Sequence, residues 1–359
     1  MLAGLAVGGL AAPVDAWRTG RPSVPALPLV PGGPPAALAP RLWIDSDAAC
    51  GAGRRTDSDD CLAVLALLAA RDDDVVGVSS TAGNAPLAIT HRTLALLLRE
   101  WSATGTAPPL YRGTEAGSAG TAPAVRALRQ ALAEGPLTVV ALGPLTNVAG
   151  ALEGHPALAA NLTRLVAVFG HRRGHLFHPS EASGRGNLFG HGPVFTDFNV
   201  RADPAAVRAV LSLGRPVTLV GYDAGRSVAI SAADLNRLVL AGGAAAWVAD
   251  RARDWLAFWN DAVGMPAFHP FDLVAAGWVL HPDRFRCART PTWVAPTRGP
   301  LRLLSPLSVV VGVPAERPPR VAVSTEAVYC ADADARLHDV LMERLVLGGA
   351  KPSAAALGE

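Results

Sequence analysis

Acidic side chains that could hold a cation gather where one apolar segment passes into the next. Asp45 and Asp47 end a short strand-like segment, and Asp59 and Asp60 begin an apolar segment of helical length. Carboxylates beside buried segments are costly unless a cation neutralises them. Calcium takes several hard oxygen ligands, both carboxylate and backbone carbonyl. The spacing therefore predicts a divalent cation site, for which calcium is the best match.

Helix capping is the alternative explanation for this acidic group. Asp59 or Asp60 would accept hydrogen bonds from free N–H groups at a helix N-terminus and interact favourably with the helix dipole. Capping explains one such residue more readily than four, two of which lie on the strand side. We therefore favour the cation site.

Composition indicates a folded globular domain. Of the 359 residues, 50% are hydrophobic and 17% are charged, which is enough for a sizeable core. The formal net charge is +2, and no basic run accompanies it. Neither a nucleic-acid partner nor a membrane span within the domain is expected.

The chain divides into four predicted regions. Residues 1–17 are an apolar leader with a signal-like end, and residues 18–40 are a Pro- and Gly-rich linker. The folded domain is expected over residues 41–350, followed by a tail over 351–359. The leader favours export, but it lacks a basic start, so a cytoplasmic protein is the alternative.

The four cysteines are Cys50, Cys61, Cys287 and Cys330. An even number in an exported chain permits two disulfides, Cys50–Cys61 across the acidic segment and Cys287–Cys330 between C-terminal strands. Four free buried thiols in a cytoplasmic protein are the alternative. No Cys or His spacing suggests zinc.

Strand-like segments alternate with helical patterns along most of the domain. This alternation predicts the α/β class, with an open, mostly parallel, Rossmann-like sheet and helices on both faces. The C-terminal part adds strand candidates at 292–296, 307–313 and 320–325. Ligands of such folds bind at the carboxyl ends of the strands. Asn84 and residues 143–147 follow two strand-like segments, so we expect them near the acidic group.

Several sequence blocks together resemble a known family. DSD…DSDD, STAGNAPLAITHRTLALL, VALGPLTNVAGAL, DFNVRADPAAVRAVL and FDLVAAGWVLHPDRF occur in the order and approximate spacing of the inosine-uridine preferring nucleoside hydrolases. The similarity runs over most of residues 41–348. It implies hydrolysis of the N-glycosidic bond of ribonucleosides with a bound calcium ion, on an open α/β sheet. Members commonly form dimers or tetramers, so a homo-oligomer is compatible with the resemblance.

The resemblance also implies roles for the acidic residues. Asp47 matches the carboxylate that both binds calcium and acts as general base. Asp60, Asp272 and the backbone carbonyl of Leu142 match the remaining protein ligands of calcium. Asp45 matches a residue that lies behind the ligands.

Other positions match the family's contacts with ribose. Asp59, Asn84 and Asn199 correspond to residues that bind the ribose hydroxyls. Asp197 stands where the family more often has Glu and is expected to face the ribose as well. Groups that bind hydroxyls distinguish ribose from deoxyribose, because they lose a partner when a hydroxyl is missing.

The chain departs from the family pattern between its two acidic pairs. Residues 48–58 form a Gly-rich insertion where the family has a short spacing. A Cys50–Cys61 disulfide would keep both acidic pairs at one cation. Arg54 and Arg55 in the insertion either meet an anionic group of the substrate or face solvent, and solvent is favoured because Arg is mostly exposed.

The leaving-group acid is the second departure. Many members have His directly before the last calcium ligand, where this chain has Phe271. Phe271 either stacks on the nucleobase or belongs to the core. His269 lies two residues earlier and is one candidate for the acid.

A long His- and Gly-rich segment supplies the other candidates. His175, His178 and His191 are alternative acids, and Asn187 is a candidate ribose ligand. The loop TEAGSAGTAP is shorter than in the family, which bears on base specificity.

Three functional hypotheses remain. The first is a calcium-dependent ribonucleoside hydrolase, and the second is a hydrolase of another riboside. The third is a non-catalytic relative, in which the calcium-stabilised domain binds a ligand or has a structural role.

Overall fold

The computed structural model describes residues 26–31, 38–53, 55–102, 106–115, 121–172, 197–296, 307–312, 317–318 and 323–349. The strands are β1 (Val30–Pro31), β2 (Leu42–Ser46), β3 (Val75–Ser80), β4 (Leu110–Arg112), β5 (Leu137–Ala141), β6 (Leu162–Ala167), β7 (His171–Arg172), β8 (Val217–Val220), β9 (Ile230–Ser231), β10 (Ala267–Phe268), β11 (Phe285–Pro296), β12 (Leu307–Val311) and β13 (Ser324–Ala333). The α-helices are α2 (Asp59–Arg71), α3 (Leu87–Ser102), α4 (Pro123–Ala133), α5 (Thr146–Leu152), α6 (Phe198–Ala202), α7 (Pro204–Ser212), α8 (Tyr222–Gly225), α9 (Ala232–Ala241), α10 (Gly243–Phe258), α11 (Phe271–Leu280) and α12 (Leu337–Gly349).

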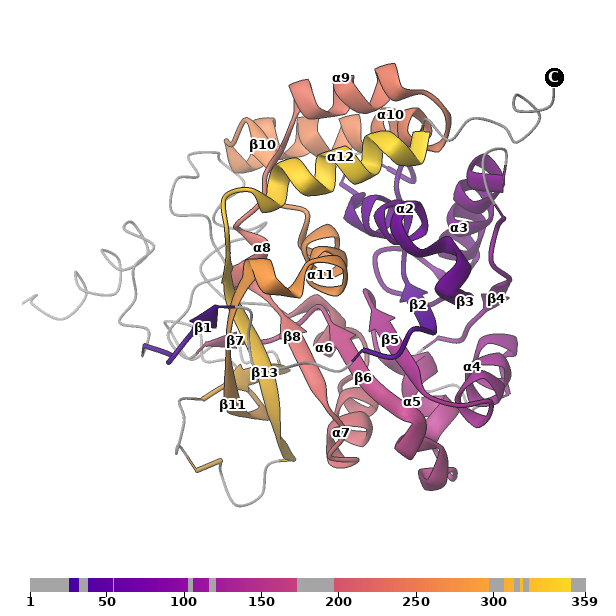
Figure 1. The fold of residues 1–359 in the computed structure, drawn as a ribbon, viewed down its shortest axis with the longest axis vertical. Helices are drawn as coiled ribbons and strands as arrows, with labels where there is room; N and C mark the ends of the chain where they lie inside the picture. Colours follow the sequence, from indigo (N-terminus) through magenta and orange to yellow (C-terminus); the bar gives the residue numbers. More distant parts are fainter. Residues whose placement is uncertain are drawn as a thin grey trace, which may run out of the picture.

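The main sheet is open and mostly parallel, which confirms the predicted fold class (Figure 1). Its strand order is β4-β3-β2-β5-β6-β8-β13-β11-β12-β7, and β1 pairs with β11 at one side. Neighbouring strands from β4 to β13 are parallel, whereas β11 runs antiparallel to both β13 and β12. The carboxyl ends of the parallel strands therefore share one edge of the sheet.

Alternate residues of the central strands enter hydrophobic cores on opposite faces of the sheet. In β2, Leu42 and Ile44 pack with one core and Trp43 packs with the other, as the two-residue period of a strand requires. Helices α4, α5 and α7 cover the Trp43 face, and α2, α3 and α11 cover the Ile44 face. Figure 1 shows α9, α10 and α12 as a further layer outside α2 and α11.

This outer layer explains why α2 and α11 are apolar almost all round. Residues 59–68 of α2 and 272–279 of α11 are all buried. A helix covered on both sides has no solvent face to make polar. Among the described residues, no helix combines the length and apolar content needed to cross a bilayer.

The sheet differs from the sequence expectation at its antiparallel side. The strand expected at 320–325 is β13, which begins only at Ser324 and continues to Ala333. Within the expected linker, Val30 and Pro31 pair with Cys287 and Arg286 of β11. The Pro-rich composition concealed this short edge strand, a position where Pro is tolerated because one side needs no ladder bond.

Both predicted disulfides are present. Cys50 is bonded to Cys61 and Cys287 to Cys330, and no free cysteine remains among the described residues. Cys287 and Cys330 are directly opposed partners of β11 and β13. The structure thus favours the disulfide prediction over the free-thiol alternative.

Removal of the Cys287–Cys330 disulfide, by the pair of changes Cys287→Ser and Cys330→Ser, is expected to lower the free energy of unfolding by about 2–4 kcal/mol, the usual range for a cross-link that constrains the unfolded chain. Urea denaturation of the oxidised protein and the variant measures this difference. Reducing agent should bring the wild-type protein towards the variant. A transition insensitive to reductant would contradict the prediction.

Candidate metal and ligand site

A cavity of about 100 Å³ lies at the carboxyl edge of the parallel strands. Loops after β2, β3, β5, β6 and β8 reach it, together with the first turns of α2, α6 and α11. Its lining combines acidic and amide side chains with apolar and aromatic ones: Asp47, Asp57, Asp59, Asn84, Leu142, Val168, Phe169, Gly170, Asp197, Phe198, Asn199, Gly221, Tyr222, Phe271 and Asp272. Every predicted ligand of calcium except Asp60 is in this set, as are the predicted ribose contacts within the described residues.

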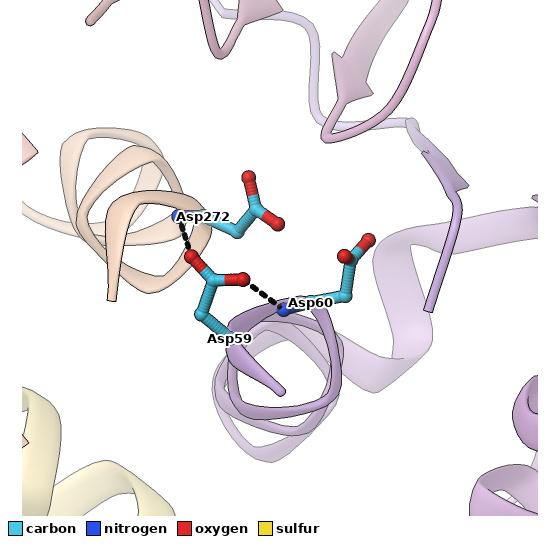
Figure 2. Close-up of side chains that lie close together, drawn as sticks. All are labelled: Asp59, Asp60 and Asp272. Atoms are coloured by element: carbon cyan, nitrogen blue, oxygen red, sulfur yellow. Dashed lines mark hydrogen bonds between the residues drawn. The ribbon is translucent and has the colours of Figure 1, made fainter. Parts of the chain in front are cut away.

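Three carboxylates converge where two helices begin. Ligand oxygens of Asp59, Asp60 and Asp272 lie within 4.8 Å of one another, and all three residues are buried (Figure 2). Asp59 links the helices, because its Oδ2 accepts the Asp272 N–H at 3.0 Å and its Oδ1 accepts the Asp60 N–H at 3.0 Å. Both oxygens of Asp59 are thus partly satisfied by backbone, whereas the Asp60 and Asp272 carboxylates extend towards the space between the helices (Figure 2).

Asp47 lies beside this group in a narrow slot of backbone. Its Oδ2 accepts the Asn84 N–H at 2.7 Å. Glycines form the walls of the slot: a Cβ at Gly83 would lie 1.9 Å from Asp47 Oδ2, and one at Gly143 would lie 2.6 Å from Oδ1. Such distances are far below van der Waals contact, so these two positions must lack a side chain.

Asp60 and Asp45 are held by polar side chains from β2 and β3, from the loop after β3 and from α5. Asp60 accepts from the Ser46 hydroxyl at 2.5 Å and from the Asn84 side-chain amide at 2.9 Å. Asp45 is fully buried and does not line the cavity; its Oδ1 accepts from Ser79 at 2.5 Å and from Asn147 at 2.8 Å. Asp45 therefore ties the strand ends together behind the cavity wall.

Two polar residues of the cavity lining come from the start of α6. Asp197 caps this helix, accepting the Val200 N–H at 3.2 Å and the Gly170 N–H at 2.8 Å. The Asn199 amide donates to the carbonyls of Leu142 at 2.8 Å and Val168 at 2.9 Å. The predicted carbonyl ligand thus faces the cavity and is oriented by a predicted ribose contact.

Burial and mutual repulsion govern the charges in this region. Burial, then the charge of Asp60, holds the pKa of Asp47 well above its usual range, and burial with the charges of Asp59 and Asp60 does the same for Asp272. Burial raises the pKa of Asp60 to about 6, and repulsion by Asp59 adds to it. Burial raises the pKa of Asp197 to about 7, and burial with a smaller contribution from the charge of Asp60 raises that of Asp45 to about 6.

The donor set fits a hard divalent cation. Carboxylates crowded into a buried space repel one another unless protons or a cation compensate their charge. All the available donors are carboxylate, carbonyl or amide oxygens, which match calcium or magnesium rather than a thiolate- or imidazole-seeking metal.

Aromatic side chains also line the cavity. Phe271 is one of them, and its ring centroid lies 5.9 Å from that of Tyr222 at an interplanar angle of 33°. Phe169 and Phe198 line the cavity as well. The cavity therefore offers apolar ring surfaces, which suit a planar ligand, in addition to its acidic groups.

His269 lies behind this wall. It is 5% exposed and does not line the cavity; its Nδ1 is 2.8 Å from the Val228 carbonyl oxygen, and its ring meets Trp259 edge-on. The geometry offers no support for His269 as the leaving-group acid. Arg55 is exposed and its guanidinium lies 5.7 Å from the Phe258 ring centroid, which agrees with the solvent-facing alternative.

The remaining candidates fall outside the described residues. They are Arg54, His175, His178, Asn187 and His191.

Two polar residues of the cavity lining were not predicted from the sequence. Asp57 lies at the end of the insertion, and Tyr222 follows β8 as one aromatic among many apolar residues. The closely spaced acids at 57, 59 and 60 are a sequence signal for Asp57, whereas Tyr222 has none.

The fold and the cavity together define an open-sheet α/β protein with a hard-cation and small-ligand site. The model of the inosine-uridine preferring nucleoside hydrolase family matches residues 42–330. The chain belongs to this family.

Relatives agree with this assignment. The chain is 32% identical over 206 residues to the non-specific ribonucleoside hydrolase RihC of Salmonella newport and, equally, of Salmonella typhimurium. The match covers 50% of this chain and 62% of the relative, so the chain spans about three fifths of the length of these relatives.

Solved structures share the fold. A plant nucleoside hydrolase superposes with a TM-score of 0.64 at 20% identity, and a purine-preferring ribonucleoside hydrolase from Gardnerella vaginalis with 0.65 at 19%. Each comparison covers 87% of this chain and 99% of the other.

A divalent cation is expected to stabilise the protein by relieving carboxylate repulsion. At 100 times its Kd, calcium should add about 2.7 kcal/mol to the free energy of unfolding, and chelator should remove it. Asp272→Asn should weaken the response. Asp250→Asn, an exposed change on α10, should leave it intact. Equal calcium-induced shifts in melting temperature for Asp272→Asn and wild type would contradict the assignment.

Proposed function

We propose that the protein hydrolyses the N-glycosidic bond of ribonucleosides, releasing ribose and the free base, in a calcium-dependent reaction. The observation that carries this proposal is the cavity, whose lining combines buried carboxylates with aromatic side chains. Membership of the family supports the same reaction class.

The proposed calcium ligands are the carboxylates of Asp47, Asp60 and Asp272 and the backbone carbonyl of Leu142. Support comes from Asp60 and Asp272, two of the three converging carboxylates, and from Asp47 and Leu142 in the same cavity. When bound, calcium supplies positive charge that favours deprotonation of a nearby water. Asp59 is assigned to ribose because backbone N–H groups already orient both of its oxygens.

Asp47 is the proposed general base. It accepts a proton from the attacking water while the water oxygen bonds to the anomeric carbon and the bond to the base nitrogen breaks. The sugar gains positive charge in the transition state, and the surrounding carboxylates stabilise it. The Asn84 N–H orients Asp47 through its Oδ2, so Oδ1 is the oxygen available to the water.

The two kinds of lining side chain match the two parts of the substrate. Asp59, Asn84, Asp197 and Asn199 bind the ribose hydroxyls, and the nucleobase stacks against Phe271. The departing base nitrogen keeps the electron pair of the broken bond, and because Phe271 cannot donate a proton, solvent water supplies the proton that completes the free base.

Asp47→Ala is expected to reduce the rate of reducing-sugar release by about 10²- to 10⁴-fold, the usual contribution of a general base. A nucleoside panel that includes inosine and uridine, with calcium or with chelator, measures the rate. Asp250→Asn is the control and should retain full turnover. Unchanged turnover in Asp47→Ala would contradict the role of Asp47 as general base. Absence of turnover in the wild-type protein on every nucleoside would favour the non-catalytic alternative.

Gly143→Ala tests the position of the Asp47 carboxylate without removing it. The new Cβ would lie 2.6 Å from Asp47 Oδ1 and must displace it. We expect kcat to fall by at least about tenfold, because a base displaced from the water loses proton-transfer efficiency. Steady-state kinetics and a melting curve measure both consequences. Full kcat in a folded variant would contradict the role of Oδ1.

A further inference from the structure

The segment between Asp47 and α2 is a loop closed by a covalent bond. Cys50 and Cys61 are 11 residues apart, and their Cα atoms lie 6.3 Å apart across the disulfide. Both half-cystines are buried, at 3% and 0% exposure. The loop therefore leaves the acidic region and returns to it at a fixed separation, with Cys61 in the first turn of the helix that carries Asp59 and Asp60.

This closed loop brings one additional carboxylate into the cavity. Asp57 lies just before α2 and lines the cavity beside Asp59. Its Oδ1 accepts the N–H groups of Ser58 at 2.7 Å and Asp59 at 3.2 Å, which orients the side chain. Burial, and then the charge of Asp59, hold the pKa of Asp57 well above its usual range.

Asp57 and Asp59 both line the cavity, where a ligand can reach them. An ionised carboxylate only accepts hydrogen bonds, so N–H or O–H groups of a ligand are the partners that suit it. Five carboxylates line the cavity: Asp47, Asp57, Asp59, Asp197 and Asp272. The lining includes no Lys or Arg among the described residues. Hydroxyl groups of a ligand are donors that fit this space.

We propose that Asp57 is a substrate-binding residue that accepts a ribose hydroxyl, and that the Cys50–Cys61 disulfide is the positioning element that holds it there. This inference rests on the proposed function, because that function supplies the ribose. It adds a sugar contact at the end of the insertion, next to Asp59.

Asp57 is not among the residues assigned to the cation. The carboxylates that converge within 4.8 Å are those of Asp59, Asp60 and Asp272, and Asp57 is outside that group. Asp57 contacts the group through Asp59, the member assigned to ribose. A hydroxyl shared by these two neighbouring carboxylates accounts for both.

Asp57→Asn tests the direct contact. The asparagine keeps an oxygen for the Ser58 and Asp59 N–H groups but lacks the charge that strengthens the hydroxyl hydrogen bond. We expect KM for inosine, and the Kd of D-ribose measured by calorimetry, to rise about 10- to 100-fold. The kcat should change less than KM, and the Kd of calcium should stay unchanged. Asp250→Asn is the matched control.

The positioning role of the Cys50–Cys61 disulfide is tested by comparing its removal with removal of the Cys287–Cys330 disulfide. Cys50→Ser with Cys61→Ser should raise KM and the Kd of D-ribose. Cys287→Ser with Cys330→Ser should lower stability but leave both constants unchanged, because that pair joins β11 to β13 away from the cavity lining. Adding Asp57→Asn to the Cys50/Cys61 variant should cause little further loss if the disulfide acts through Asp57.

The outcomes separate this inference from the proposed function. Unchanged KM and ribose affinity in Asp57→Asn would overturn it while leaving nucleoside hydrolysis intact. Weaker calcium binding without weaker ribose binding would make Asp57 a cation ligand and also overturn it. Additive losses would overturn the positioning role of the disulfide. If wild-type protein cleaved no nucleoside, ribose calorimetry would still decide the role of Asp57.

Discussion

Mutual repulsion among buried carboxylates is the interaction on which the site depends. The repulsion is tolerable because α2 and α11 both begin at the cluster, so the positive ends of two helix dipoles face it. The Asp59 side chain couples these helix starts through two backbone N–H groups. Folding therefore assembles the charges before any ligand arrives, and a cation completes the compensation.

The layers of the fold make that arrangement rigid. Because α9, α10 and α12 cover them from outside, α2 and α11 are enclosed and cannot turn their first residues towards solvent. The parallel strands deliver the remaining polar groups to the same edge, where Asp45 and Asn147 join adjacent strand ends. Rigid support at this edge lets glycine-lined backbone approach Asp47 closely.

Sequence patterns predict the parallel strands of the sheet better than the elements at its antiparallel side. Alternating apolar segments define the sheet, and acids at strand and helix ends locate the cavity. The sequence pattern fails where tertiary contacts determine the secondary structure. The strand β1 lies in a Pro-rich segment and forms because it pairs with β11. Likewise, His269 looks suited to acid chemistry by its sequence position, but its ring lies between the core and the cavity wall. Asp57 is found only once the loop is folded.

The covalent closure between Cys50 and Cys61 has a consequence for redesign. A cross-link fixes the distance between loop ends, so lengthening the middle of the loop costs little additional closure entropy. The carboxylates at either end should therefore keep their positions while the residues between them are exchanged. Residues between Cys50 and Cys61 can therefore be exchanged to alter ligand recognition without moving the carboxylates beside the loop.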